Sequence, residues 1–355
     1  MADIRRFIAP GVQARTVYHV AAGEPAIKLD AMENPYRLPM ELRDRWLYAL
    51  RDLALNRYPS PEQYERVKAR LARDAGLAPH TGVILGNGSD EILQNILLAL
   101  DAHVTVVAPT PTFVMYEQIA AILGRRFVGV PLLEDFALDV PAVADALTRH
   151  APAILFLAYP NNPTGTLYPA EAMRALLDID GAAIVVDEAY YPFAQASLIT
   201  AVEDRPQLLV VRTLSKQGFA GLRFGWLAAD RAWTDELDKV RLPYNVSVVT
   251  AASVDFALDY ADVFADQALR IRAERTRLYE ALSALVTVWP SEANFLLFRP
   301  PVPGDAARIH ARLMEAGILI KNLAAAGGAL TGCLRVTVGT PAENDAFLAA
   351  LAQAL

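Results

Sequence analysis

The run Ala183-Ile-Val-Val186 leads directly into the polar turn Asp187-Glu-Ala-Tyr190, and this junction is the clearest structural signal in the chain. Its hydrophobicity is continuous rather than alternating, which is typical of a strand buried on both faces of a parallel sheet. Further apolar runs of this kind end in a polar or glycine-containing turn and precede helical periodicity: Val83–Leu85, Val104–Val107, Ala153–Ala158 and Leu208–Val211. The pattern predicts an α/β domain with a mainly parallel central sheet.

Polar motifs follow these apolar runs within a few residues. They are Gly88-Ser-Asp90, Asn162, Asp187 and the pair Ser215-Lys216. Ligands of parallel sheets bind outside the carboxyl ends of the strands. We therefore expect these side chains to meet in one site.

Lys216 has the most distinctive position among them. Most lysines are solvated surface charges, but this one lies on a glycine-containing loop just after a buried strand, seven residues before Arg223. A lysine in such a place can form a Schiff base with the aldehyde of pyridoxal phosphate. We favour this catalytic role over that of a surface lysine.

Other side chains near these strand ends suit the ring of that cofactor. Asp187 could cap a helix, but its carboxylate could also keep the pyridinium nitrogen protonated so that the ring withdraws electrons. Tyr190 could reach the phenolate oxygen or pack in the core. Asn162 lies in a turn sequence that would point its amide at the same oxygen. Phe113 could stack on the ring or pack in the core, and both options stay open.

The segment Gly86-Asn-Gly-Ser-Asp-Glu91 is similar to a dinucleotide fingerprint, but the third glycine is missing. We interpret it as a helix N-terminus at which Gly88, Ser89 and Asp90 receive the cofactor phosphate on free backbone N–H groups. Ser215 and Arg223 complete the predicted phosphate ligands, because a guanidinium and a hydroxyl form charge-assisted hydrogen bonds with phosphate. Together, these residues predict pyridoxal phosphate as cofactor and the transformation of an amino group.

A chain of 355 residues favours two domains over one core. We expect a large cofactor-binding domain over residues 32–245, and a smaller α+β domain formed by the N-terminal arm 1–31 together with 246–355. The second part has a helical stretch from about Thr250 to Leu285 and two strand-like runs, Ala293–Phe298 and Cys333–Val338.

Composition excludes several classes of function. A net charge of −7 without any basic run argues against a nucleic-acid partner. The single cysteine allows no intramolecular disulfide, and the five histidines show no metal-binding spacing. We expect no metal and no membrane segment, and a cytoplasmic location.

As a set, the motifs resemble the histidinol-phosphate aminotransferases, in fold type I of the pyridoxal phosphate enzymes. The matching segments are Asn34-Pro-Tyr36, Asn56-Arg-Tyr-Pro59, Gly86–Glu91, Tyr159–Gly165, Val186–Tyr190, Thr213–Lys216, Ala220–Arg223, Ala293-Asn-Phe295 and Leu334–Thr340. The resemblance implies a ping-pong reaction in which glutamate and 2-oxoglutarate exchange an amino group with histidinol phosphate and its keto form, imidazole-acetol phosphate.

The resemblance also implies a homodimer with active sites at the subunit interface. Tyr58 would reach the phosphate of the cofactor in the partner subunit. Arg335 would bind the acidic end of the substrate, with Lys321 and Tyr36 in the same substrate site. Lys216 would carry a proton between the substrate carbon and the cofactor carbon.

Three departures from the family pattern lie in the substrate pocket. Gly11 stands where relatives often have tyrosine, Met32 replaces an asparagine, and Lys321 replaces an arginine. Three alternatives therefore stay open: an aromatic amino acid aminotransferase, a decarboxylase of the threonine-phosphate type, and the effector-sensing domain of a transcription regulator.

Overall fold

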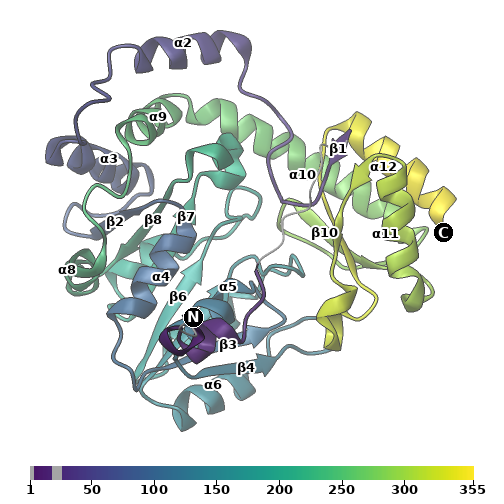
Figure 1. Ribbon diagram of the computed structural model, residues 1–355, viewed down its shortest axis with the longest axis horizontal. Coiled ribbons are helices and arrows are strands. Elements are labelled where there is room, and N and C mark those ends of the chain that lie inside the picture. The colour runs from purple at the N-terminus through teal and green to yellow at the C-terminus, as the bar shows by residue number, and fades with distance from the viewer. Residues whose placement is uncertain (1–3, 18–25) are drawn as a thin grey trace.

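The computed structural model describes residues 4–17 and 26–355 (Figure 1). Its α-helices are α1 (Pro10–Gln13), α2 (Met40–Leu50), α3 (Pro61–Asp74), α4 (Ser89–Ala99), α5 (Met115–Ile122), α6 (Val140–Arg149), α7 (Ala170–Leu177), α8 (Arg231–Val240), α9 (Val248–Asp259), α10 (Ala261–Ser283), α11 (Ala306–Glu315) and α12 (Pro341–Ala354). Its strands are β1 (Ile27–Lys28), β2 (Gly82–Gly86), β3 (Thr105–Thr110), β4 (Phe127–Pro131), β5 (Ala153–Ala158), β6 (Ala182–Asp187), β7 (Leu208–Thr213), β8 (Gly225–Ala229), β9 (Thr287–Val288), β10 (Phe295–Arg299), β11 (Ile318–Leu319), β12 (Lys321–Asn322) and β13 (Leu334–Thr337). Short 3-10 or π-helical turns are η1 (Ile4–Phe7), η2 (Ile199–Glu203), η3 (Ser215–Phe219), η4 (Ala220–Leu222), η5 (Pro303–Asp305), η6 (Ala324–Ala326) and η7 (Gly328–Leu330).

A seven-stranded sheet in the order β2-β8-β7-β6-β5-β3-β4 forms the centre of the molecule. The pairs among β3 to β7 are parallel, whereas β8 runs antiparallel to both β7 and β2. The connection from β7 to β8, residues 214–224, contains only short turns and no crossover helix, so the chain returns antiparallel. Because β8 opposes both neighbours, β2 points in the same direction as β5, β6 and β7. The prediction of a mainly parallel α/β sheet is confirmed.

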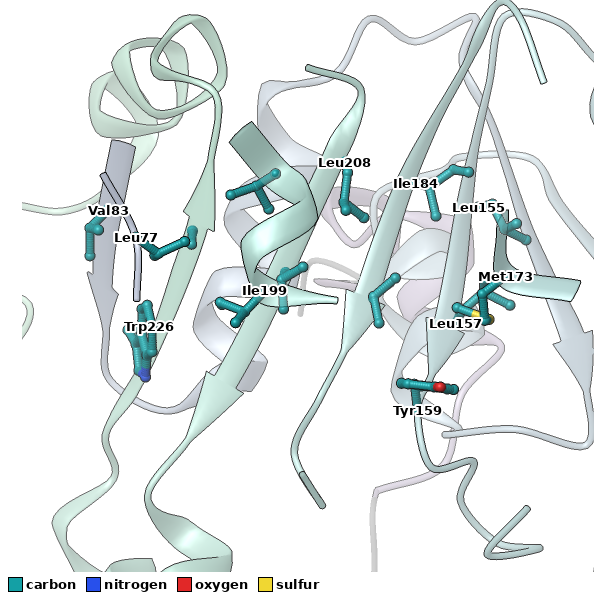
Figure 2. Close-up of a cluster of buried hydrophobic side chains, with 14 of the residues drawn as sticks. Leu77, Val83, Leu155, Leu157, Tyr159, Met173, Ile184, Ile199, Leu208 and Trp226 are labelled. Carbon is teal, nitrogen blue, oxygen red and sulfur yellow. The ribbon is translucent and has the colours of Figure 1, made fainter. Parts of the chain in front are cut away.

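Both faces of this sheet are covered, which explains the continuous apolar runs. Along β6, Ile184 and Val186 point into one core with side chains from α3, α6, α7 and α9. Val185 points to the opposite face, into a core with side chains from α4, α5 and α8. Figure 2 shows Leu155 and Leu157 of β5 beside Met173 of α7 in the first core. Full burial of one such side chain stabilises the fold by about 1.5–3 kcal/mol.

A second, antiparallel sheet in the order β12-β13-β10-β9 lies beside the first (Figure 1). Its core takes side chains from α10, α11 and α12. The short strand β1 pairs in parallel with β11, which brings the segment before Leu29 next to this part of the chain.

The helical stretch predicted from about Thr250 to Leu285 is two helices rather than one. The break is at Tyr260, whose φ of −119° and ψ of 32° are not helical. Ala251 and Val254 of α9 pack into the core of the central sheet, whereas Ile271 of α10 packs into the second core. After this break α10 runs from the first core, where Phe264 packs, into the second.

The N-terminal segment packs on the central domain through α1. Gly11 lies so close to α5 that a Cβ at this position would be 2.0 Å from the carbonyl oxygen of Ala121. Arg15 forms an ion pair with Glu117 at 3.3 Å. The glycine at position 11 is therefore required by this close approach. Among the helices that the structure describes, none is both long and apolar enough to cross a membrane.

Candidate active site

Most of the predicted site residues line one pocket at the carboxyl ends of the central strands. The predicted residues in its wall are Ser89, Asp90, Phe113, Asn162, Asp187, Tyr190, Ser215, Lys216 and Arg223. Met32, Ala158, Ala189 and Thr213 complete the lining. The antiparallel course of β8 keeps the end of β2 on the same edge as β5, β6 and β7, and this is why motifs far apart in sequence converge.

Lys216 lies on the π-helical turn η3, directly after β7. Its Nζ is 3.4 Å from the carbonyl oxygen of Ala31 and 5.8 Å from the ring centre of Tyr190. Burial of the amine, followed by the nearby guanidinium of Arg335, lowers the pKa of Lys216 to about 8. A larger fraction of this amine is neutral near pH 7 than in an ordinary lysine, and the neutral amine is the nucleophilic form.

Asp187 is the last residue of β6 and is only 4% exposed. Its Oδ2 accepts a hydrogen bond from the hydroxyl of Tyr116 at 2.9 Å, and its Oδ1 accepts one from the backbone N–H of Ala189 at 3.1 Å. Burial raises the pKa of Asp187 to about 6, and the two hydrogen bonds oppose that rise. The carboxylate is therefore fixed in position at the pocket wall.

Asn162, Tyr190 and Arg335 form a buried hydrogen-bonded chain. Asn162 Nδ2 donates to the Tyr190 hydroxyl at 3.0 Å, and Arg335 Nη1 donates to Asn162 Oδ1 at 2.5 Å. Arg335 Nη2 also donates to the carbonyl oxygen of Asp30 at 3.0 Å. Burial raises the pKa of Tyr190, so its hydroxyl stays protonated and available as a donor.

The start of α4 and the loop before β8 form a cationic corner. Gly88 precedes α4 with a φ of 90°, and no side chain caps the helix there. Arg223 is in the left-handed region with a φ of 49°. Its Nη2 is 3.3 Å from Asp90 Oδ2 and its Nη1 is 3.5 Å from Ser215 Oγ. Free N–H groups at a helix start, a hydroxyl and a guanidinium are the donors that bind a phosphate.

Two glycines at this corner disfavour larger residues, Gly88 through its φ of 90° and Gly225 through close contact with backbone. A Cβ on Gly88 would be 2.7 Å from Arg223 Nη2. A Cβ on Gly225 would be 2.5 Å from the backbone nitrogen of Ser89. The phosphate donors, the amine of Lys216 and the carboxylate of Asp187 therefore fit a cofactor that has a phosphate, an aldehyde and a basic ring nitrogen.

Five of the predicted residues are outside the pocket lining: Gly88, which directly precedes Ser89, and Tyr58, Arg335, Lys321 and Tyr36. Tyr58 is 75% exposed and stacks on Tyr244, with ring centres 4.2 Å apart. Arg335 reaches the site through Asn162, and Lys321 is its register partner across β12 and β13. Tyr36 is partly buried, with its ring centre 5.9 Å from the guanidinium of Arg270.

Comparison with known proteins agrees with this geometry. The family described as aminotransferase class I and II matches residues 24–351. A histidinol-phosphate aminotransferase 2 of Nitrosococcus oceani is 49% identical over 351 residues, which cover 98% of this chain and 97% of that protein. This chain belongs to the family of class I and II aminotransferases.

Solved structures of related enzymes share the fold of this aminotransferase. The histidinol-phosphate aminotransferase of Sinorhizobium meliloti, crystallised with pyridoxal 5'-phosphate, is 27% identical with a TM-score of 0.86, covering 98% of this chain and 97% of that one. An L-threonine-O-3-phosphate decarboxylase of Porphyromonas gingivalis is 22% identical with a TM-score of 0.79, covering 92% and 98%. The second likeness concerns the fold alone, so the fold does not distinguish amino transfer from decarboxylation.

The sequence did not indicate Tyr116 or Thr213, whose side chains contact predicted residues of the aminotransferase site. Tyr116 donates to Asp187 from α5, three residues after Phe113. Thr213 Oγ1 donates to Ser215 Oγ at 2.9 Å. A buried tyrosine on a helix and a threonine at a strand end are ordinary core residues, and only the folded structure shows which atoms they contact.

Proposed function

We propose that this aminotransferase uses pyridoxal phosphate to exchange an amino group between histidinol phosphate and 2-oxoglutarate, forming imidazole-acetol phosphate and glutamate. The observation that carries the reaction type is the amine of Lys216 in the same pocket wall as Asp187 and the phosphate donors. The substrate rests on the relatives, because proteins up to 49% identical over nearly the full chain bear the name histidinol-phosphate aminotransferase.

Bound in this pocket, pyridoxal phosphate would supply an aldehyde for the amino group and a ring that withdraws electrons from the reacting carbon. Lys216 Nζ would take a proton from the substrate carbon and return it to the cofactor carbon, and a pKa of about 8 suits that exchange near neutral pH. Asp187 would accept a hydrogen bond from the protonated ring nitrogen. Tyr190 and Asn162 would hydrogen-bond the ring oxygen, and Phe113 would cover one face of the ring.

The phosphate of the cofactor is assigned to the cationic corner. Gly88 directly precedes α4 and has no side chain that would cover the helix start. The backbone N–H groups of Ser89 and Asp90 point out of this end of the helix. The Ser215 hydroxyl and the Arg223 guanidinium lie 3.5 Å apart, and Arg223 Nη2 is 3.3 Å from Asp90 Oδ2 at the start of α4. These donors would orient the cofactor, so that its reactive end lies at Lys216.

Substrate anions are assigned to Arg335 and Lys321, with Tyr36 nearby. Directly opposed residues of an antiparallel pair project on the same side of the sheet, so Lys321 and Arg335 share one face of it. A carboxylate or phosphate at this face would be attracted by both positive charges. The planar guanidinium of Arg335 binds either anion with two hydrogen bonds, and this would allow one site to serve both half-reactions.

A homodimer is part of the proposal, and the surface of α2 supports it. This helix has no buried residue, and it contacts α9 through a 2.8 Å hydrogen bond from Trp46 Nε1 to Ser253 Oγ. Leu47 and Tyr48 are exposed on it, and Figure 1 shows α2 standing outside the rest of the molecule. We assign this face to the subunit interface, with Tyr58 reaching the partner subunit's cofactor phosphate.

Mixed dimers test that arrangement. Subunits with Lys216→Ala, which should be inactive alone, are mixed with subunits with Tyr58→Ala, which should be weakly active alone. In a mixed dimer one site receives both native residues, so activity returns on mixing if Tyr58 acts across the interface. Activity that stays at the level of the separate variants would contradict the shared site.

The domain division and the location are proposed on simpler grounds. We assign cofactor binding to a large domain of residues 32–245, and a smaller domain to residues 246–355 together with the arm 1–31. Residues 1–3 and 18–25 of the arm lie outside the described part of the chain. The separate apolar cores of the two sheets support two domains, while α1 and α9 pack on the domain of the central sheet. A cytoplasmic location agrees with the single cysteine, Cys333, which is buried as a free thiol.

The reaction is tested by half-reactions followed in the absorption spectrum of the cofactor. Histidinol phosphate alone should convert the aldehyde form of the bound cofactor into its amine form, and 2-oxoglutarate should restore it. Conversion by phenylalanine or tyrosine but not by histidinol phosphate would favour an aromatic aminotransferase, and release of carbon dioxide from a phosphorylated amino acid would favour a decarboxylase.

Lys216→Ala should abolish both half-reactions and prevent borohydride from fixing the cofactor to the chain. The control is Lys239→Ala, since Lys239 is an exposed lysine paired with Glu236 at 2.6 Å. This control should behave like the unaltered protein. Turnover by the Lys216 variant at the native rate would refute the assignment.

A further inference from the structure

The hydroxyl of Tyr116 contacts Asp187 in the interior, behind the pocket. Tyr116 is 1% exposed and does not line the pocket, whereas Asp187 does. The hydroxyl donates to Asp187 Oδ2 at 2.9 Å. The proposed roles of the site residues make no use of this contact, although it joins a buried phenol directly to the carboxylate assigned to the ring nitrogen.

Asp187 needs such a donor because few other groups favour its ionised form. Burial is the largest influence on its pKa and raises it, and Asp90 at the start of α4 raises it further. Lys216 lowers it, as do the hydrogen bonds from Tyr116 and from the backbone of Ala189. Tyr190, the remaining titratable neighbour, stays neutral because burial raises its own pKa.

Tyr116 is held in the orientation that this contact requires. Its ring packs edge-on against Phe113 at 5.6 Å and lies 5.2 Å from Phe156 of β5. Burial, and then the negative charge of Asp187, raise the pKa of the Tyr116 phenol well above its ordinary value. The hydroxyl therefore keeps its proton and acts as a donor at every working pH.

We propose that Tyr116 is a positioning residue that holds the Asp187 carboxylate ionised and aimed at the ring nitrogen of the cofactor. This inference rests on the proposed function. With Oδ2 held by Tyr116 and Oδ1 by Ala189, the carboxylate cannot rotate, and its remaining acceptor capacity faces the pocket. A protonated Asp187 would have no charge to keep the ring nitrogen protonated. By favouring the ionised carboxylate, the Tyr116 hydroxyl therefore helps the ring to withdraw electrons.

The test measures the dissociation constant of pyridoxal phosphate from pH 5 to pH 9 for the unaltered protein and for Tyr116→Phe. Loss of a hydrogen bond to a charged group should weaken binding about tenfold near pH 7. The acid limb of the binding profile should also move to higher pH, because the pKa of Asp187 rises when its donor is lost. The absorption spectrum of the bound cofactor should show a less protonated ring.

Tyr168→Phe is the matched control. Tyr168 is equally buried, and within the described residues its hydroxyl has no hydrogen-bond partner. Its removal should leave the binding profile unchanged. A comparable loss of affinity in both variants would show a general packing effect and would overturn the inference.

A double-mutant cycle with Asp187→Asn separates positioning from other effects of the tyrosine. If Tyr116 acts through the carboxylate, Tyr116→Phe should add little to the affinity loss of Asp187→Asn. The inference would be refuted if the two losses of cofactor affinity add up, or if the acid limb of the binding profile stays at the same pH in Tyr116→Phe. Either result would leave the proposed function intact. If the unaltered protein binds no pyridoxal phosphate at Lys216, the proposed function itself fails.

Discussion

Replacing Asp187 by asparagine should stabilise the cofactor-free protein while it removes activity. Burial raises the pKa of this carboxyl from 3.8 to about 6. One pKa unit corresponds to about 1.4 kcal/mol, so the ionised carboxylate destabilises the fold by about 3 kcal/mol. Asparagine has the same shape and no charge to bury: its oxygen can accept from the backbone N–H of Ala189 while its amide group donates to the Tyr116 hydroxyl.

The pH dependence of this effect follows from the sign of the shift. Below about pH 4 the carboxyl is protonated in the folded and unfolded states, and the charge costs nothing. Between about pH 4 and pH 6 the unfolded state releases its proton first, so the stability of the native protein falls, and above pH 6 the difference is constant. The advantage of Asp187→Asn should therefore be about 3 kcal/mol at pH 8 and about 1 kcal/mol at pH 4.5.

Urea unfolding of the two cofactor-free proteins, at one protein concentration and at both pH values, measures this difference. Asp235→Asn is the control, because Asp235 is an exposed aspartate and its replacement should give no such gain. With pyridoxal phosphate present the order should reverse, since only the native carboxylate pairs with the ring nitrogen. The reasoning would be refuted if Asp187→Asn were no more stable than the native protein at pH 8. It would also be refuted if the difference in the free energy of unfolding were the same at both pH values.

Two further substitutions test the backbone around the pocket. Gly88→Ala should lower both stability and cofactor affinity, because a methyl group at a φ of 90° would lie 2.7 Å from Arg223 Nη2. The control is Gly181→Ala, where φ is 76° and no atom lies within 4 Å of the added methyl group. It should lower stability by about 1 kcal/mol and leave cofactor affinity unchanged. Equal affinities in the two would contradict a phosphate role for this corner. Met32→Asn should change the free energy of unfolding by less than about 0.5 kcal/mol, whereas Met32→Val should cost more than about 1 kcal/mol, because Met32 has a φ of 54°, which asparagine tolerates and β-branched residues do not. Thermal unfolding of the two variants decides this, and a tolerated valine would contradict the strained conformation.

The central sheet was predictable because its apolar runs are set by burial on both faces, which is a local property of the sequence. The strands β4 and β8 were not predicted. β8 carries the run Gly225–Ala229, but its antiparallel course depends on the short return through η3 and η4, which is a property of the connection. The break at Tyr260 was missed for a similar reason, since Ala- and Leu-rich sequence on both sides favours helix, and the two cores that separate α9 from α10 are tertiary.

The site followed the same division between local and tertiary information. Ser89, Asn162, Asp187 and Lys216 could be found because each follows a strand, and parallel strands bring their ends together. Arg335 was assigned by resemblance, and the structure places its guanidinium on Asn162 from the second sheet. No periodicity or spacing predicts that contact, because it depends on how the two sheets pack.

Tyr116 shows why such contacts matter to the energetics of the fold. The sequence places an apolar strand before Asp187, so the charge must be buried, and the structure supplies two hydrogen bonds that recover only part of the cost. Pairing with a positively charged ring nitrogen would offset the cost that remains. Cofactor affinity and the instability of the empty pocket therefore have one origin. A substitution that makes the empty pocket more stable by neutralising Asp187 must therefore weaken cofactor binding.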